Sequence, residues 1–228
     1  MKRLLWFAAV AAVCVSCGGK KSGYVIDGKI AEGRTDLEGK YVYLIPYGSD
    51  GAATDSALIE KNTFKLQGEP TADGLYALYL KDEGDEMMSR VGEAPFSAVF
   101  VLQKGEMQAV LDSFSYVTGT PENNAFKDIR SVLVDAQKNY MNLVSNVKEG
   151  ELEAVKAKAK QLEDEMMAKV KAYIEANPNK LTTAKLLADF QFALDEQVQE
   201  AALAKADSAF MNIPGIKEIA EHLQVMKK

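Results

Sequence analysis

The chain has 228 residues, with 27 Lys plus Arg against 33 Asp plus Glu and a formal net charge of −6. Hydrophobic residues make up 47% and charged residues 26%, the balance of a folded protein rather than a disordered one. The negative charge argues against nucleic acid as a partner, because proteins that bind it usually carry a basic patch. Two cysteines and one histidine are too few for a Cys- or His-rich metal site, and we expect neither a metal nor a cofactor.

The N-terminus has the pattern of a bacterial lipoprotein signal. Two basic residues at positions 2 and 3 precede an unbroken apolar run from Leu4 to Val15. That run is too short for a membrane span, which needs roughly 20 apolar residues, but it is typical of a secretory signal. Ser16 before Cys17 resembles the lipobox at which lipoprotein signals are cleaved. We predict that residues 1–16 are removed and that Cys17 carries the lipid.

Two alternatives to this cleavage stay open. An ordinary signal peptide cut nearby is the first, and lipidation of Cys14 is the second, although Val13 is a poor small residue before a cut. Residues 17–23, which contain only Cys, Gly, Lys and Ser, read as a lipidated flexible tether. Because Cys17 would carry the lipid, we expect an envelope protein anchored to a membrane. Because Cys17 is also the one cysteine of the mature chain, we expect no free thiol and no disulfide.

Residues 24–120 have the period of two that is typical of short strands separated by turns. In the run 41–47, Tyr41, Tyr43 and two further large residues lie on one face, with Val42 and Leu44 on the other. About eight such strands predict an antiparallel β-sandwich or barrel. Several strands are apolar on both faces, which indicates a second layer against the sheet. Besides the runs 24–30 and 41–47, strands are predicted at 56–60, 63–68, 75–81, 96–103, 107–112 and 115–118.

After Pro121 the apolar period changes to between three and four. The pattern predicts two long amphipathic helices, 126–147 and 152–173, joined by a short turn as an antiparallel hairpin. Asn177-Pro178 ends the second helix. The predicted fold class is therefore α+β, with a β-domain at 24–120 and a helical domain at 121–228. Three shorter helices are predicted at 181–194, 197–210 and 216–225.

Several short motifs carry a family resemblance. They are residues 24–30 (YVIDGKI), 40–44 (KYVYL), Asp55-Ser56, 62–68 (NTFKLQG) and the turn 119–123 (GTPEN). Together they resemble the N-terminal domain of unknown function 4369 of lipoproteins from the Bacteroidetes, over roughly residues 24–125 and more loosely into the helices. The resemblance implies a β-domain followed by helices, on a protein located at the outer membrane. In many relatives this region precedes a thioredoxin-like module, but no C-x-x-C follows it in this sequence, so the redox activity is not carried over.

Tyrosines on the predicted strands are the best candidates for a binding surface. Tyrosine is amphipathic and common at binding patches. The alternative is that these rings fill the space between the sheet and the helices, and the sequence leaves it open. The candidates are Tyr41, Tyr43, Tyr47, Tyr76 and Tyr79.

Other polar groups give weaker evidence of a functional site. The acidic run 82–86 could suggest a calcium loop, but Met87 occupies the position where such a loop needs glycine, so a solvated loop is favoured. Asp27 and Asp55 could act as an acid–base pair, although Asp near turns is commonplace. His222 is interpreted as a lone surface histidine.

These observations favour a non-catalytic protein. The sequence holds none of the common nucleophile, phosphate-loop or metalloprotease motifs, and we expect no enzyme activity. The interpretation is a lipid-anchored interaction or ligand-binding module of the cell envelope, whose partner is an envelope protein or a small ligand. The alternative is an accessory to thiol–disulfide or peroxide chemistry carried out by a separate thioredoxin-like partner, which rests on the family resemblance alone.

Overall fold

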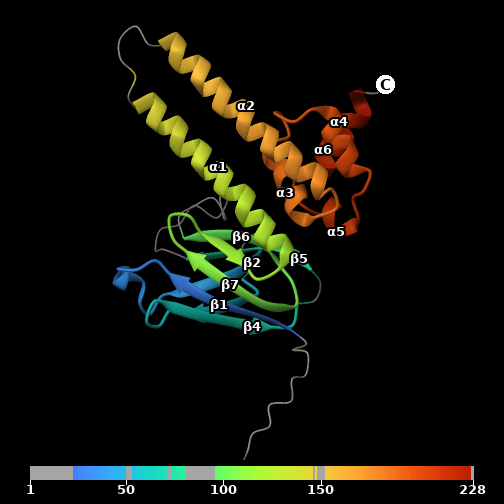
Figure 1. The fold of residues 1–228 in the computed structure, drawn as a ribbon. Coiled ribbons are helices and arrows are strands. Elements are labelled where there is room, and N and C mark those ends of the chain that lie inside the picture. The colour runs from blue at the N-terminus through green and yellow to red at the C-terminus, as the bar shows by residue number, and fades with distance from the viewer. Residues whose placement is uncertain are drawn as a thin grey trace, which may run out of the picture.

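The fold is taken from a computed structural model that describes residues 23–49, 53–70, 73–80, 96–145, 147 and 152–226. Within these residues eight strands are followed by helices, so the predicted α+β fold is confirmed (Figure 1). The predicted signal peptide, Cys14 and Cys17 lie outside the described residues, as do residues 17–22 of the tether and the acidic loop 82–86.

The strands form two four-stranded sheets that lie as separate layers (Figure 1). Sheet A has the order β4-β1-β7-β8, and sheet B has the order β3-β2-β5-β6. Side chains of both sheets fill one core between them, so the fold is a sandwich rather than a closed barrel. The strands are β1 (Tyr24–Ile30), β2 (Tyr41–Pro46), β3 (Asp55–Leu58), β4 (Thr63–Gly68), β5 (Gly74–Leu80), β6 (Ser97–Leu102), β7 (Gly105–Leu111) and β8 (Tyr116–Thr118).

The sequence predicts an antiparallel sandwich, but the sandwich is not wholly antiparallel. β1 pairs antiparallel with β4 on one side and parallel with β7 on the other, so that Ile26 lies opposite both Leu66 and Met107. The chain builds sheet B and β4 between these two strands, and β7 then starts at the same end as β1. Alternation of apolar residues reports which face is buried and carries no information on strand direction, which is why the pattern missed this pair.

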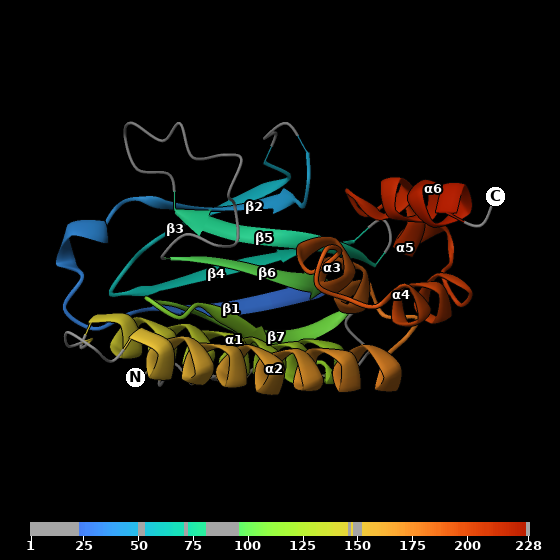
Figure 2. The same cartoon turned by 90° about the horizontal axis from the view of Figure 1, so that it is seen from above.

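The first two helices form the predicted hairpin. α1 and α2 lie side by side, and their far ends project beyond the sandwich, while the four shorter helices gather in one cluster (Figures 1 and 2). The helices are α1 (Pro121–Ser145), α2 (Leu152–Ala176), α3 (Leu181–Asp189), α4 (Glu196–Leu203), α5 (Ser208–Met211) and α6 (Ile216–Met226).

The prediction of one helix over 197–210 is wrong, because this segment forms α4 and α5. The carboxylate of Asp207 accepts a hydrogen bond from the backbone N–H of Phe210 at 2.9 Å. An Asp that satisfies a backbone donor in this way is a preferred N-cap, and it begins a new helix rather than continuing the old one.

Sheet B is covered by sheet A on one face and, at β5 and β6, by the helices on the other. Val42 and Leu44 point into the sandwich, whereas Leu75 and Val101 pack on the other face against the helices. All six residues of β6 are buried. The prediction that strands apolar on both faces meet a second layer is therefore confirmed.

The turn 119–123 joins the layers. Glu122 Oε1 accepts hydrogen bonds from the backbone N–H and the hydroxyl of Thr182, at the start of α3, both at 3.2 Å. Gly119 has a φ of 109°, and a Cβ there would lie 2.5 Å from the backbone oxygen of Glu106. The close approach and the positive φ both require glycine, so this motif is a packing junction.

Candidate functional site

Three of the five candidate tyrosines form a ladder on the outer face of sheet B. The ring centroids of Tyr41 and Tyr43 are 6.3 Å apart, and those of Tyr43 and Tyr79 are 5.7 Å apart. Tyr43 and Tyr79 lie opposite each other in the β2–β5 register. Tyr41 is 47% exposed, whereas Tyr79 is buried, so the ladder presents its Tyr41 end to solvent.

The other two tyrosines lie elsewhere. Tyr47 packs against the helical core, where Lys185 Nζ lies 5.2 Å from the centre of its ring. Tyr76 packs against the sandwich core and lies opposite Phe100 in the β5–β6 register. Tyr47 therefore fits the alternative in which the rings fill the space between the sheet and the helices, whereas Tyr76 lies against the core between the two sheets. Sequence spacing could not divide the five tyrosines.

The candidate carboxylates do not meet. Asp27 accepts a hydrogen bond from Lys65 Nζ at 2.7 Å on sheet A, and Asp55 accepts one from the Tyr24 hydroxyl at 3.1 Å. Burial and the nearby Asp55 carboxylate raise the pKa of Tyr24. Each carboxylate has its own partner, so the two form no acid–base pair. His222 is exposed on α6, as predicted.

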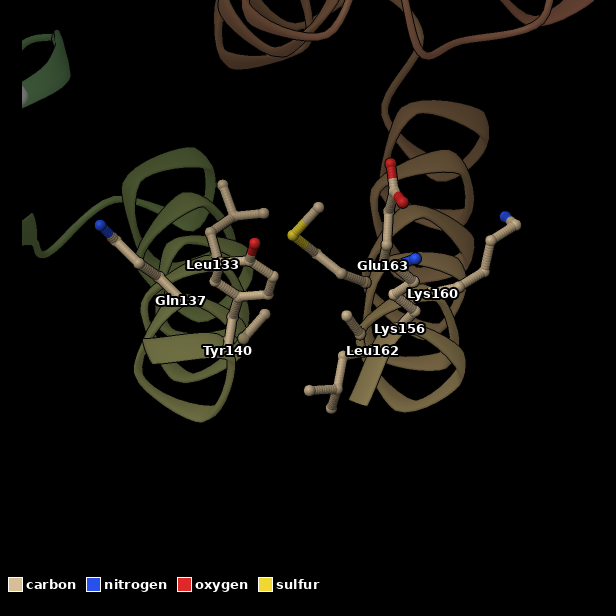
Figure 3. A pocket seen from close by; sticks show the side chains of 10 residues that line it. Leu133, Gln137, Tyr140, Lys156, Lys160, Leu162 and Glu163 are labelled. Atoms are coloured by element: carbon tan, nitrogen blue, oxygen red, sulfur yellow. The ribbon is translucent and has the colours of Figure 1, made fainter. Parts of the chain in front are cut away.

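A groove of about 490 Å³ runs between α1 and α2. In Figure 3, Leu133 of α1 and Leu162 of α2 both point into the space between the helices, while Gln137 points away from it. The groove is hollow because small residues, Ala136 and Ala159, occupy the seam where the helices meet. The lining residues are Leu133, Ala136, Gln137, Tyr140, Lys156, Ala159, Lys160, Leu162, Glu163 and Met166.

The sequence holds a signal for this groove in the size of the residues along the two helix seams. Leu133, Ala136 and Tyr140 follow the i, i+3, i+7 spacing of a helix seam, as do Ala159, Leu162 and Met166. An alanine in each stripe leaves room that a Leu would fill.

A second hollow of about 640 Å³ adjoins the groove, where β6, α1 and α3 meet. Leu133 and Gln137 line both hollows. Four charged residues line the second hollow, namely Arg130, Lys138, Lys185 and Asp189. Among the described residues, the remaining lining is apolar side chains, three serines and Gln137.

Two of the three cations of this hollow are held in place. Arg130 Nη1 donates to the backbone oxygen of Ser115 at 2.8 Å, and its guanidinium lies 5.6 Å from the centre of the Phe114 ring. Lys185 is almost wholly buried and pairs with the Asp189 carboxylate one helical turn on. Burial acts to lower the pKa of Lys185, but Asp189 and Tyr47 outweigh it and hold that pKa above its usual value. The lysine therefore stays charged.

The described part of the chain has no group of three or more metal-ligating side chains. In that same part, no helix combines the length and the apolar character that crossing a membrane requires.

Comparison with known families adds one match. Residues 24–126 match the model of DUF4369, a domain of unknown function. The predicted domain over 24–125 is thereby confirmed. No curated protein and no solved structure matches the chain. The DUF4369 domain ends within α1, just after it contributes Phe126 to the second hollow, so Arg130 and the groove lie beyond it.

Proposed function

We propose that this protein is a non-catalytic, lipid-anchored binding module of the cell envelope, which holds an apolar ligand in the groove between α1 and α2. The groove carries the proposal. Its volume of about 490 Å³ lies in the range of small-molecule sites, and Leu133, Leu162 and Met166 give it an apolar lining.

The surroundings of the groove support a binding role. Tyr140 lines the groove and is 48% exposed, and Met141 and Leu152 near the hairpin tip are exposed by more than half. Large apolar side chains gathered on one exposed part of a protein mark a binding region more often than chance. Large apolar side chains are thus exposed at the groove and near the end of the hairpin.

The anchor is supported by the N-terminal sequence. The basic head, the short apolar run and the Ser16-Cys17 pair are typical of a lipoprotein signal. Two or three acyl chains on Cys17 hold a protein stably at a membrane, whereas one holds it only reversibly. The resemblance to lipoproteins of the Bacteroidetes supports the outer membrane as the location.

Binding in the groove is tested with N-phenyl-1-naphthylamine, a neutral apolar dye that fluoresces on leaving water. The protein is the mature chain from residue 17 with Cys17→Ala, so that neither lipid nor detergent competes. We expect saturable binding that the double variant Ala136→Leu/Ala159→Leu abolishes. Ala157→Leu, on the exposed face of α2, is the matched control and should bind like the parent chain. Absence of dye binding, or equal binding by the filled variant, would overturn the proposed function.

The anchor is tested in the full precursor. Cys17→Ala should abolish labelling by a radioactive fatty acid and release the protein from membranes. Labelling that persists in Cys17→Ala and disappears in Cys14→Ala would move the lipid to Cys14, and labelling that survives both changes would refute lipidation.

A further inference from the structure

We infer that the ligand of the groove is a single-chain amphiphile with an anionic head, whose chain lies between α1 and α2 and whose head lies in the adjoining hollow of β6, α1 and α3. This inference rests on the proposed function and names the chemical class of its ligand. The juxtaposition of an apolar hollow with a cationic one carries it.

The two hollows adjoin each other along α1. Leu133 and Gln137 line both of them, one helical turn apart on the same helix. A ligand that extends from the groove across Leu133 would reach the second hollow. Each hollow alone has the volume of a small-molecule site, so the pair suits an elongated ligand with one chain rather than a compact one.

The second hollow is positive in a negative protein. Its described lining holds three cations, Arg130, Lys138 and Lys185, against one carboxylate, Asp189, although the whole chain has a net charge of −6. Lys185 and Asp189 neutralise each other as a pair. The described lining therefore carries more cations than carboxylates, and a concave site with apolar walls concentrates the effect of that charge on an anion.

Arg130 is the better placed of the two to recognise the head. The Ser115 oxygen and the Phe114 ring orient its guanidinium at the wall of the hollow. A guanidinium matches a carboxylate or phosphate in shape and binds either with paired hydrogen bonds. The head belongs on the α1 side of the hollow, because Asp189 on the α3 side repels an anion.

The remaining lining favours a ligand with an apolar part over a simple inorganic anion. Val99, Phe126, Leu186 and Phe190 contribute apolar surface beside the charged groups. Displacing water from this surface favours a ligand that brings its own apolar part. A head attached to a chain satisfies both kinds of surface, whereas phosphate alone satisfies one.

The test is displacement of N-phenyl-1-naphthylamine by three amphiphiles that share one chain: dodecanoate, dodecanol and dodecyltrimethylammonium, all as monomers. We expect dodecanoate to displace the dye at about tenfold lower concentration than dodecanol, the effect of one charge-assisted contact, with the cation weakest. Inorganic phosphate should not displace it. Arg130→Gln and Lys138→Gln should each weaken dodecanoate several-fold and leave dodecanol unchanged, and Lys158→Gln, on α2 outside both hollows, is the matched control.

The outcomes separate the two proposals. Equal displacement by all three amphiphiles would overturn the anionic head while leaving the groove as a binding site, and failure of the dye to bind would overturn the groove itself. Sedimentation with phosphatidylglycerol vesicles, without displacement by monomeric dodecanoate, would also overturn the inference, because the anion would then belong to a membrane surface. Should Arg130→Gln fail to fold, the exposed Lys138 still decides the result.

Discussion

The side-chain amide of Asn123 hydrogen-bonds to both backbone groups of Val101. The N–H of Val101 donates to Asn123 Oδ1 at 2.8 Å, and Asn123 Nδ2 donates to the Val101 oxygen at 2.9 Å. Val101 lies on β6, which ends sheet B in the described structure, so the amide satisfies groups that a further strand would otherwise bind. Asn123 is 1% exposed, and it fixes the first turn of α1, and hence the hairpin, to the sandwich.

Replacing Asn123 should therefore destabilise the protein. Asn123→Ala leaves two buried backbone groups of Val101 without partners, and we expect a loss of about 3 kcal/mol in the free energy of unfolding. Urea denaturation measures it. Asn124→Ala is the control, because the Asn124 side chain accepts from Gly119 N–H at 3.0 Å in an exposed position and should matter by less than about 1 kcal/mol. Similar losses for both variants would contradict this role.

The ring of Phe64 covers Gly28. A Cβ at position 28 would lie 2.0 Å from Phe64 Cζ, so Gly28→Ala should cost about 1–3 kcal/mol of stability by overpacking. In a Phe64→Leu background the same change should cost less, because the ring that clashes is gone. A double-mutant cycle by chemical denaturation measures this coupling, and strictly additive effects would refute the packing argument.

The protein should be more stable when Lys185 and Asp189 are both present, or both replaced, than when Asp189 alone is replaced. Asp189→Asn leaves a nearly wholly buried ammonium without its carboxylate, which typically costs about 3 kcal/mol. The double variant Lys185→Met/Asp189→Asn removes the buried charge and should recover part of that loss. Thermal and urea unfolding give the comparison, and a double variant less stable than Asp189→Asn would rule out this account.

Tyr173 should make stability sensitive to alkaline pH. Its hydroxyl shares a hydrogen bond of 2.8 Å with Thr182. Burial, assisted by the Glu122 carboxylate, raises the pKa of Tyr173 from 10.0 to about 12, although the hydrogen bond to Thr182 acts to lower it. Between these values the folded chain keeps a proton that the unfolded chain loses, so stability falls as pH rises through this window. Tyr173→Phe should make the fall shallower, whereas Tyr140→Phe, which removes an exposed hydroxyl, should not. Urea denaturation across the window measures the slope, and equal slopes for the parent chain and Tyr173→Phe would contradict the assignment.

Local patterns predicted the elements well because each depends on neighbours in the chain. Val42 and Leu44 alternate with tyrosines in the sequence, and the structure buries them on the sandwich side of β2. The sequence predicts only a turn for the GTPEN motif at 119–123. Its role as a junction depends on Val101 and Thr182, which lie 22 and 60 residues from the Asn123 and Glu122 that they contact.

The sequence by itself determined the α+β order of elements, the helical hairpin and the match of residues 24–126 to a domain of unknown function. Period and turn chemistry are properties of neighbouring residues, so they can be read without a fold. The tertiary structure alone decided that β1 and β7 run parallel and that the five tyrosines separate. It alone brought Arg130 of α1 beside Lys185 of α3 next to an apolar groove. These relationships join segments far apart in the chain, and packing, rather than local pattern, selects them.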